Sequence, residues 1–355
     1  MSRTSSTPAL SGDLLAWYRA HRRDLPWRRT TDPYRIWLSE VILQQTRVDQ
    51  GLAYWERFVA KWPTVQDLAA ASEAEVLKMW QGLGYYSRAR NLLAGARQVV
   101  NEHGGRFPDT HAGLLKLKGV GDYTAAAIAS ICFGRPDAVL DGNVFRVLAR
   151  VYGIETPIDS TEGRKRFRAL AQQLIDPEQP GDHNQAMMEL GATVCTPRNY
   201  TCLLCPLQPQ CVAFATGAID ALPVKAGKVK VRERHFNYLH IRKGNGLYMR
   251  HRTGKDIWQG LWEPPMVETD GPVDAAGLRK ALSSASIAGR WTITRHSGPV
   301  KHVLSHQVIQ AVFWEVVPPD TWKAPAQWKA VTGARLRKLA VPRLVERWME
   351  GTVVR

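Results

Sequence analysis

The chain has 355 residues, enough for two compact domains that each bury a hydrophobic core. A hydrophobic content of 45% and a charged content of 23% are ordinary for a soluble globular protein. The formal net charge of +16 is not, and it favours a polyanionic partner, either nucleic acid or an anionic membrane surface. Because no apolar run reaches membrane-spanning length and the N-terminal stretch lacks an apolar signal core, we expect no membrane association and a reducing, cytoplasmic setting.

The first two thirds of the chain is predicted to be helical. From Leu14 to about Ala215 the apolar residues recur with helical spacing, and no convincing strand interrupts them. Ser11 is predicted to cap the first helix, with Asp13 in its first turn. Further helices are expected over residues 33–50, 54–60, 73–79, 89–100, 122–131, 144–151, 165–174 and 184–195.

The pattern changes after Phe214. Residues 221–228 carry Pro, Gly and Lys and are predicted to be a linker, followed by strands at 238–241 and 247–250 around a Gly244-Asn245-Gly246 turn. A strand at 307–317 and helices at 275–283 and 335–349 complete a mixed α/β domain. We therefore predict a multidomain protein with an all-α domain (1–218), a linker (219–233) and an α/β domain (234–355).

Four cysteines lie close together with the spacing C-x6-C-x2-C-x5-C, at Cys195, Cys202, Cys205 and Cys211. Four thiolates in so short a stretch can enclose one metal centre. An iron–sulfur cluster is favoured, and a structural zinc ion is the alternative. A reducing setting disfavours disulfides. The fifth cysteine, Cys132, lies in an apolar run and is interpreted as a small core residue.

Gly119 and Gly121 separate two predicted helices. Glycines allow backbone turns that leave amide groups open at a helix N-terminus, an arrangement that binds phosphate without reading sequence. The alternative is that the glycines only allow a tight turn between two helices. The basic composition favours the first interpretation, in which the amide groups bind phosphates of the DNA backbone.

Two carboxylates are candidates for chemistry. On a helix, Glu40 shares a face with Ile36 and Leu43, so that apolar surroundings raise its pKa and suit it to act as a general acid. A Glu paired with a buried Arg is the alternative. Asp141 is predicted to be an N-cap that stays ionised, because amide groups and the helix dipole stabilise its charge. A pair of carboxyl groups, one with a raised pKa and the other with a lowered pKa, is typical of enzymes that cleave glycosidic bonds.

These motifs resemble a known family, the helix-hairpin-helix DNA glycosylases with a [4Fe–4S] cluster, and among them the adenine DNA glycosylases of the MutY type. The resemblance implies a helical glycosylase domain, a Nudix-like α/β domain and a [4Fe–4S] cluster held by the four cysteines. It also implies a monomeric, nucleoid-associated bacterial enzyme of base excision repair, whose partner is double-stranded DNA with adenine opposite 8-oxoguanine or guanine. The matching stretches are 23–27, 37–46, 82–90, 119–124, 140–144, 184–191 and the cysteine cluster.

The resemblance also implies roles for individual side chains. Glu40 is the general acid that protonates the adenine, which must first leave the base stack. Asp141 stabilises the oxocarbenium ion or its covalent adduct, with support from Asn143 and Tyr123. The remaining implied contacts are an adenine pocket of Arg23, Leu25, Trp27 and Gln185 and a duplex wedge of Gln44 and Tyr85.

Position 123 distinguishes the nearest relatives. Endonuclease III carries a lysine there, which forms a Schiff base and allows strand cleavage. Tyr123 has no amine, so we expect a monofunctional glycosylase that leaves an abasic site. Relatives often have a lysine after the valine of Asp-Gly-Asn-Val, whereas this chain has Phe145, so covalent trapping by that route is not expected.

The resemblance extends to the second domain. Arg252, residues 260–262 and residues 302–306 match, and Ser305 and His306 are implied to contact 8-oxoguanine; a polar loop between strands is the alternative. Leu304 stands where the family usually has Phe. Residues 275–287 offer no Glu-rich metal-binding helix, so we expect binding without nucleotide hydrolysis.

Two other interpretations are open. One is a non-catalytic iron–sulfur DNA-binding protein in which Glu40 and Asp141 are structural. The other is an endonuclease III-like pyrimidine glycosylase, which Tyr123 and the second domain disfavour.

Overall fold

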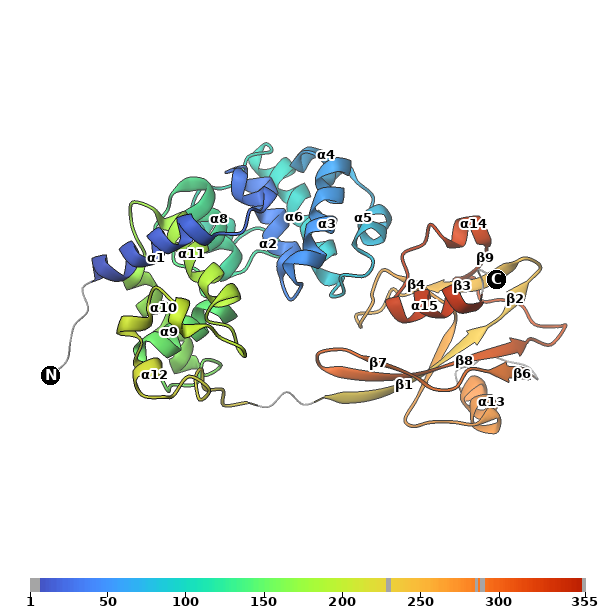
Figure 1. Cartoon of the computed structure of the whole chain (residues 1–355). Helices are drawn as coiled ribbons and strands as arrows, with labels where there is room; N and C mark the ends of the chain where they lie inside the picture. The colour runs from blue at the N-terminus through green and yellow to red at the C-terminus, as the bar shows by residue number, and fades with distance from the viewer. Residues whose placement is uncertain (1–6, 228–230, 285–286, 288–290, 353–355) are drawn as a thin grey trace. The chain divides into compact units, whose positions relative to one another are not determined.

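The computed structural model describes residues 7–227, 231–284, 287 and 291–352 and divides into two compact units (Figure 1). Unit 1 comprises Met1–Ala70 and Asn91–Gly227, and unit 2 comprises Ala71–Arg90 and Lys228–Arg355. Unit 2 therefore includes a short segment from the helical part of the chain. No helix in the described ranges combines the length and apolarity needed to cross a membrane.

Between Thr7 and Ala215 the described residues contain helices and no strand, which confirms the predicted all-α region. The α-helices are α1 (Thr7–His21), α2 (Pro33–Leu43), α3 (Val48–Lys61), α4 (Val65–Ala70), α5 (Glu73–Trp80), α6 (Ser87–His103), α7 (His111–Leu114), α8 (Asp122–Phe133), α9 (Gly142–Tyr152), α10 (Thr161–Leu174), α11 (Pro180–Thr193) and α12 (Val212–Ala215), with 3-10 turns η1 (Pro26–Arg29), η2 (Cys202–Leu204) and η3 (Gln208–Gln210).

The core of unit 1 places the first turns of α8 and α9 beside α11. Leu14 and Tyr18 of α1, Ala126 of α8, Val147 of α9 and Leu190 of α11 are buried in one hydrophobic cluster. Gly191 permits the close approach of α11 to α9, because a Cβ atom there would lie 2.6 Å from the Cβ of Asn143.

Two predictions about helices in unit 1 are wrong. Ser11 is not an N-cap, because α1 already begins at Thr7; its hydroxyl instead donates to Asp176 Oδ2 at 3.0 Å. The helix predicted over 33–50 is two helices, since the chain turns at Gln45, whose φ is 58°. No Gly or Pro marks this break, and the apolar residues on either side of it continue the helical spacing.

Unit 2 is α/β, as predicted, with two sheets. The first has the order β5-β1-β8-β6, and β7 also pairs with β8; β1 and β8 are parallel. The second has the order β2-β3-β4, with β9 also on β3. The elements after the linker are β1 (Arg232–His240), β2 (Arg242–Lys243), β3 (Gly246–His251), β4 (Trp262–Glu263), β5 (Met266–Thr269), α13 (Ala275–Ser284), β6 (Thr292–His296), β7 (Val300–Val303), β8 (Gln307–Val317), β9 (Trp328–Thr332), α14 (Gly333–Leu336) and α15 (Arg343–Thr352).

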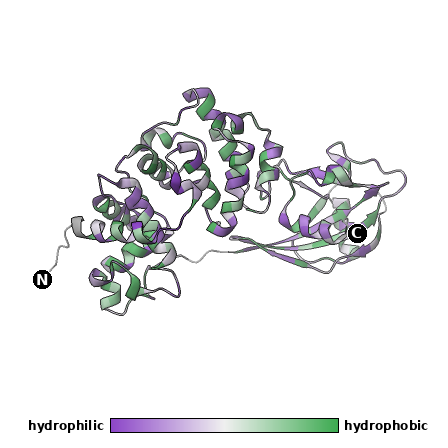
Figure 2. Cartoon of the chain, turned by 45° about the horizontal axis from the view of Figure 1, so that its top comes forward, coloured by the Kyte–Doolittle hydropathy of each residue, from purple (hydrophilic) through white to green (hydrophobic). Residues whose placement is uncertain are grey.

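Hydrophobic and hydrophilic residues are interspersed along the strands of unit 2 (Figure 2). Because successive residues of a strand point to opposite faces, apolar residues of β1 and β8 supply two cores, one on each face of the first sheet. Tyr238 and Phe313 pack in the cluster that includes Leu344 of α15. Leu239 and Trp314 pack in the cluster that includes Leu278 of α13. The strand predicted over 307–317 is confirmed as β8.

Three details of the second domain differ from prediction. The helix predicted over 335–349 is interrupted between α14 and α15, because Pro342 lacks an amide donor and disfavours helix at the residue before it. The glycine turn joins β2 to β3, whereas residues 238–241 largely belong to the longer strand β1 in the other sheet. Strand β1 already begins at Arg232, within the predicted linker. Residues 228–230 of that linker lie outside the residues that the structure describes.

Candidate active site

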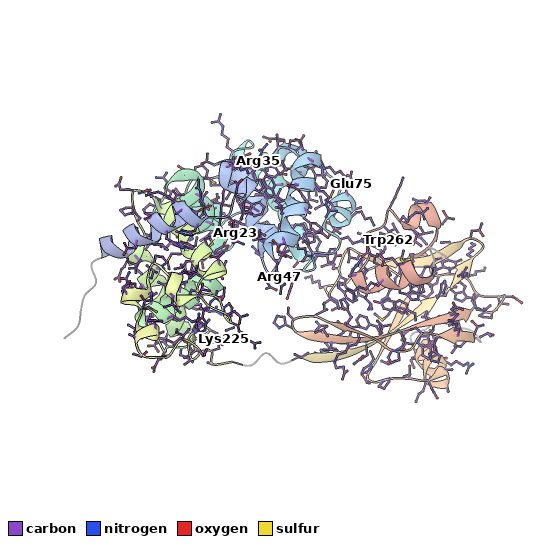
Figure 3. The ribbon with its side chains drawn as sticks, in the orientation of Figure 1. Arg23, Arg35, Arg47, Glu75, Lys225 and Trp262 are labelled. Carbon is purple, nitrogen blue, oxygen red and sulfur yellow. The ribbon has the colours of Figure 1, made fainter. Side chains whose placement is uncertain are left out.

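A cavity of about 500 Å³ lies in unit 1. It brings together side chains from the α1–α2 connection, from α2, from the first turns of α8 and α9, and from α11. Arg23 and Arg47 on its border are labelled in Figure 3. The predicted site residues that line it are Arg23, Leu25, Trp27, Glu40, Tyr123, Asp141, Asn143 and Gln185.

Helix α2 presents Glu40 to this cavity. The helix begins at Pro33 after the N-cap Asp32, whose carboxylate accepts from the Tyr34 amide at 2.9 Å. Helical spacing then places Ile36, Glu40 and Leu43 on one face, and all three line the cavity.

The Glu40 carboxyl is partly buried and faces the cavity, whose lining mixes apolar side chains with charged ones. Burial raises its pKa to about 7, and the nearby charge of Asp141 also raises it. The Tyr123 hydroxyl donates to Glu40 Oε2 at 2.6 Å and opposes the shift. Burial also keeps Tyr123 neutral, because its pKa is raised well above 10. Glu40 can therefore hold or release a proton near neutral pH.

Asp141 caps α9, as predicted. Its Oδ1 accepts from the amides of Asn143 at 2.9 Å and Val144 at 2.8 Å, and its Oδ2 accepts from the Asn143 side-chain amide at 2.8 Å. These hydrogen bonds lower the pKa of Asp141, as predicted, but the expected net lowering is wrong. Burial of the carboxylate outweighs the hydrogen bonds and raises its pKa above the usual range.

A third carboxylate, Glu189 of α11, was not predicted. It is fully buried and accepts from Arg23 Nη2 at 2.6 Å and from Arg28 Nη2 at 2.7 Å. These hydrogen bonds lower its pKa to about 2 although burial opposes them. Its position four residues after Gln185, on the same helix face, was the available signal. By binding the Arg23 guanidinium, Glu189 holds in place a side chain that lines the cavity.

The candidate adenine-binding side chains differ in exposure. Leu25 and Trp27, at η1, are buried, whereas Gln185 of α11 is partly accessible from the cavity. Gln44 does not line the cavity; it follows the end of α2, and its side-chain amide lies 3.4 Å from Thr124 Oγ1.

The glycine hairpin precedes α8 directly. Gly119 has a φ of 79°, and a Cβ atom there would lie 2.6 Å from Asn91 Cβ, so no larger residue fits. Gly121 is the exposed N-cap residue of α8, the helix that carries Tyr123 in its first turn. The hairpin thus lies two residues from the cavity.

The four cysteines of the C-x6-C-x2-C-x5-C cluster line one small hollow of about 20 Å³. Among the described residues, no three Cys, His, Asp or Glu side chains form a ready-made metal site. The donor set nevertheless fits a thiolate-bound cluster, since Arg150 Nη1 donates to Cys195 Sγ at 3.5 Å and supplies positive charge beside the sulfur atoms. Burial raises the pKa of the Cys205 thiol to about 11.

The remaining candidate residues lie in unit 2, around a second cavity of about 370 Å³. Tyr85 is hydrogen-bonded to the hydroxyl of Ser305, and His306 lines the same cavity. The rings of Trp258 and His302 meet edge to face at 5.8 Å beside them. The structure thus places the predicted adenine-site residues at a cavity of unit 1 and Tyr85, Ser305 and His306 at a cavity of unit 2, whereas Gln44, the glycine hairpin and the cysteines lie outside both.

Comparisons with known proteins agree with this architecture. Residues 38–175 match the HhH-GPD superfamily of base excision DNA repair proteins, and residues 237–351 match the NUDIX domain. A thermostable thymine-DNA glycosylase of known structure is 30% identical, with a TM-score of 0.55, and covers 59% of this chain and 97% of its own. An endonuclease III–DNA complex, 21% identical with a TM-score of 0.51, shows the fold alone. The fold and the helical site therefore define a glycosylase of the helix-hairpin-helix superfamily.

Curated relatives narrow this class. The human adenine DNA glycosylase is 52% identical, covering 90% of this chain and 70% of its own length. The rat adenine DNA glycosylase is 38% identical, covering 94% and 76%. The chain belongs to the adenine DNA glycosylase family, which confirms the resemblance and the predicted enzyme class, a hydrolase of N-glycosyl bonds.

Proposed function

We propose that this protein excises adenine paired with 8-oxoguanine or guanine in duplex DNA and leaves an abasic site. The observation that carries the proposal is the meeting of Glu40, with a pKa raised to about 7, and Asp141 at one cavity. A base can reach such a cavity only after it leaves the duplex stack, so the reaction requires base flipping.

Glu40 supplies the proton. Tyr123 occupies Glu40 Oε2, so the proton to be transferred resides on Oε1. Transfer to adenine, at N7, makes the base a better leaving group, and the electron pair of the C1′–N9 bond departs with it. The Tyr123 hydrogen bond then stabilises the carboxylate that remains, which favours proton release at the moment of bond cleavage.

Asp141 acts on the sugar. Bond cleavage leaves positive charge at C1′, and a carboxylate beside that carbon stabilises the oxocarbenium ion or forms its covalent adduct. The positive charge that develops at C1′ lowers the pKa of Asp141 and so offsets the effect of burial on this carboxyl group. Water then bonds to C1′, displaces the Asp141 carboxylate where the adduct has formed, and loses a proton to solvent, which completes the abasic site.

Other parts of the chain bind the duplex. The amides at Gly119 and Gly121 suit a phosphate, and the net charge of +16 supports a polyanionic partner. Gln44 and Tyr85 are proposed to wedge into the duplex, and Ser305 and His306 to contact the opposite base. Cys195, Cys202, Cys205 and Cys211 are proposed to hold a [4Fe–4S] cluster with a structural role.

The direct test uses duplexes with adenine opposite 8-oxoguanine, guanine or thymine. We expect the purified protein to release adenine from the first two and to leave the adenine–thymine pair intact. Release of a pyrimidine with adenine untouched would favour the endonuclease III-like alternative, and binding without any base release would favour a non-catalytic protein.

The excision rate should decrease at alkaline pH. Because Glu40 must be protonated and its pKa is about 7, we expect the single-turnover rate to fall about tenfold per pH unit above that value. Duplex binding should be measured at each pH as the control. A rate that stays flat up to about pH 9 with unchanged binding would contradict general acid catalysis by Glu40.

The product strand should stay intact until it is heated in alkali. Tyr123 places a phenol where an amine is needed for Schiff-base chemistry, so we expect no strand breaks and no borohydride-trapped complex through that position. Gel analysis with and without hot alkali checks this. Breaks that form without alkali would show that another amine of the chain reaches C1′.

Iron, not zinc, should accompany the protein. Metal analysis of anaerobically purified protein is expected to give about four iron atoms per chain with visible absorbance, as a thiolate-bound [4Fe–4S] cluster requires. Replacing Cys202 by Ser should reduce both signals together. Stoichiometric zinc in protein that excises adenine normally would overturn the assignment of the cluster.

A further inference from the structure

The loop that carries Tyr85 has an unusual backbone. Tyr85 has a φ of 47°, in the left-handed region that residues with a side chain rarely adopt. Tyr85 is 42% exposed, so burial of its side chain does not explain the conformation. Other contacts must hold the loop in this shape.

Two side chains bind the carbonyl groups just before Tyr85. The Trp80 indole Nε1 donates to the Gly84 carbonyl at 3.0 Å. Arg88 Nη2 donates to the carbonyls of Leu83 at 3.3 Å and Gly84 at 3.4 Å. One guanidinium therefore fixes two successive peptide groups of the loop.

Arg88 also contacts the two aromatic rings on either side of the turn. Its guanidinium carbon lies 5.1 Å from the Trp80 ring centroid and 5.8 Å from that of Tyr85. The guanidinium is largely buried, which lowers its pKa to about 10 while leaving it charged at neutral pH. A planar, charged group with several fixed donors suits this place better than an ammonium.

We propose that Arg88 is a positioning residue for recognition of the base opposite the adenine, because it holds Tyr85 in the orientation that reaches Ser305. The inference rests on the proposed function of Tyr85 and Ser305. Both residues lie in unit 2 with Arg88, and their hydroxyl groups are hydrogen-bonded to each other. Arg88 acts through Tyr85 and does not line the cavity itself.

The experiment is a double-mutant cycle between Arg88→Gln and Tyr85→Leu. The readout is the ratio of Kd values for duplexes with guanine and with 8-oxoguanine opposite a non-hydrolysable 2′-fluoro-adenosine. We expect each single variant to lower this preference about five- to tenfold and the double variant to lower it no further than Tyr85→Leu alone. Arg88→Lys, which keeps the charge and loses the planar donors, should recover only part of it.

Two controls separate positioning from general damage. Arg97→Gln removes another arginine of α6, which donates to the Ala69 carbonyl at 3.1 Å, and should leave the preference unchanged. The maximal excision rate with 8-oxoguanine opposite adenine should stay within about twofold in Arg88→Gln, since the acid and its cavity are untouched. If Arg88→Gln melts far below the parent protein, the Arg88→Lys comparison replaces it.

The outcomes are distinct. If Tyr85→Leu leaves the preference intact, the proposed function of Tyr85 fails. If Tyr85→Leu lowers the preference but the Arg88 variants do not, or if the two effects multiply, Tyr85 keeps its role and the inference about Arg88 is overturned.

Discussion

Replacing Glu40 by Gln is expected to abolish adenine excision while leaving duplex binding within a few-fold of the parent protein. Gln is nearly isosteric and keeps an oxygen that accepts from Tyr123, but it has no proton of suitable acidity to transfer. General acid catalysis contributes about 10²- to 10⁴-fold, so the single-turnover rate should fall by at least that factor. Rapid-quench kinetics on adenine opposite 8-oxoguanine, with Kd from the non-hydrolysable duplex, measures both quantities.

Thermal unfolding of the same variant separates a lost acid from a damaged fold. Glu40 retains its proton up to about pH 7 in the folded protein but only to about 4.5 in the unfolded chain. The unfolded state therefore binds fewer protons between these values, and the parent protein loses stability as the pH rises through them. Gln does not titrate, so Glu40→Gln should match the parent near pH 5 and be more stable by about 1–3 kcal/mol near pH 8.5.

Near-normal excision by Glu40→Gln would show that another group protonates the base. A variant that is inactive and also less stable at pH 8.5 would indicate a structural carboxylate, the alternative in which Glu40 pairs with a buried arginine. In the structure the Arg28 guanidinium is bound to Glu189 at 2.7 Å, and it affects Glu40 through its charge, which lowers the Glu40 pKa.

The helical domain was predictable because its elements are long and periodic and carry local end signals. Pro33 and the N-cap Asp141, for instance, mark helix starts that the sequence pattern indicates. The break at Gln45 was not predictable, because the apolar spacing is continuous across it. A glutamine whose backbone adopts the left-handed conformation also has no local sequence signature. Pro342, by contrast, was a visible signal that should have divided the last predicted helix.

The sequence predicted the direction of the Glu40 pKa shift but not that of Asp141. Motif spacing indicated Glu40 and Asp141, and the structure places both at one cavity. The sign of the Asp141 pKa shift depends on how deeply the cap is enclosed, which no local pattern reveals. Glu189 was missed for a similar reason, since its partners Arg23 and Arg28 lie more than 160 residues away in the sequence.

Replacing Asp141 by Asn is the second change with a large expected effect. Asn is as good an N-cap as Asp, and its oxygen can still accept from the amides of Asn143 and Val144. The NH₂ group that replaces Oδ2 faces the Asn143 amide, so one hydrogen bond is lost at a cost of about 1 kcal/mol. The excision rate should fall about 10²- to 10³-fold, because the positive charge at C1′ loses its nearby carboxylate.

Two measurements distinguish electrostatic catalysis by Asp141 from capping. Near neutral pH, Asp141→Asn should unfold with at most the small loss of one hydrogen bond, because the variant also removes a buried charge that costs stability. Asp141→Ala should lose the cap as well and be about 1 kcal/mol less stable than the Asn variant. If Asp141 serves only as a cap, the Asn variant will excise adenine at nearly the parent rate and the Ala variant will be the slower one. If its charge stabilises the cation, both variants will be equally slow despite their different stabilities. Both lack the negative charge, which stabilises an oxocarbenium ion but is not needed to cap a helix.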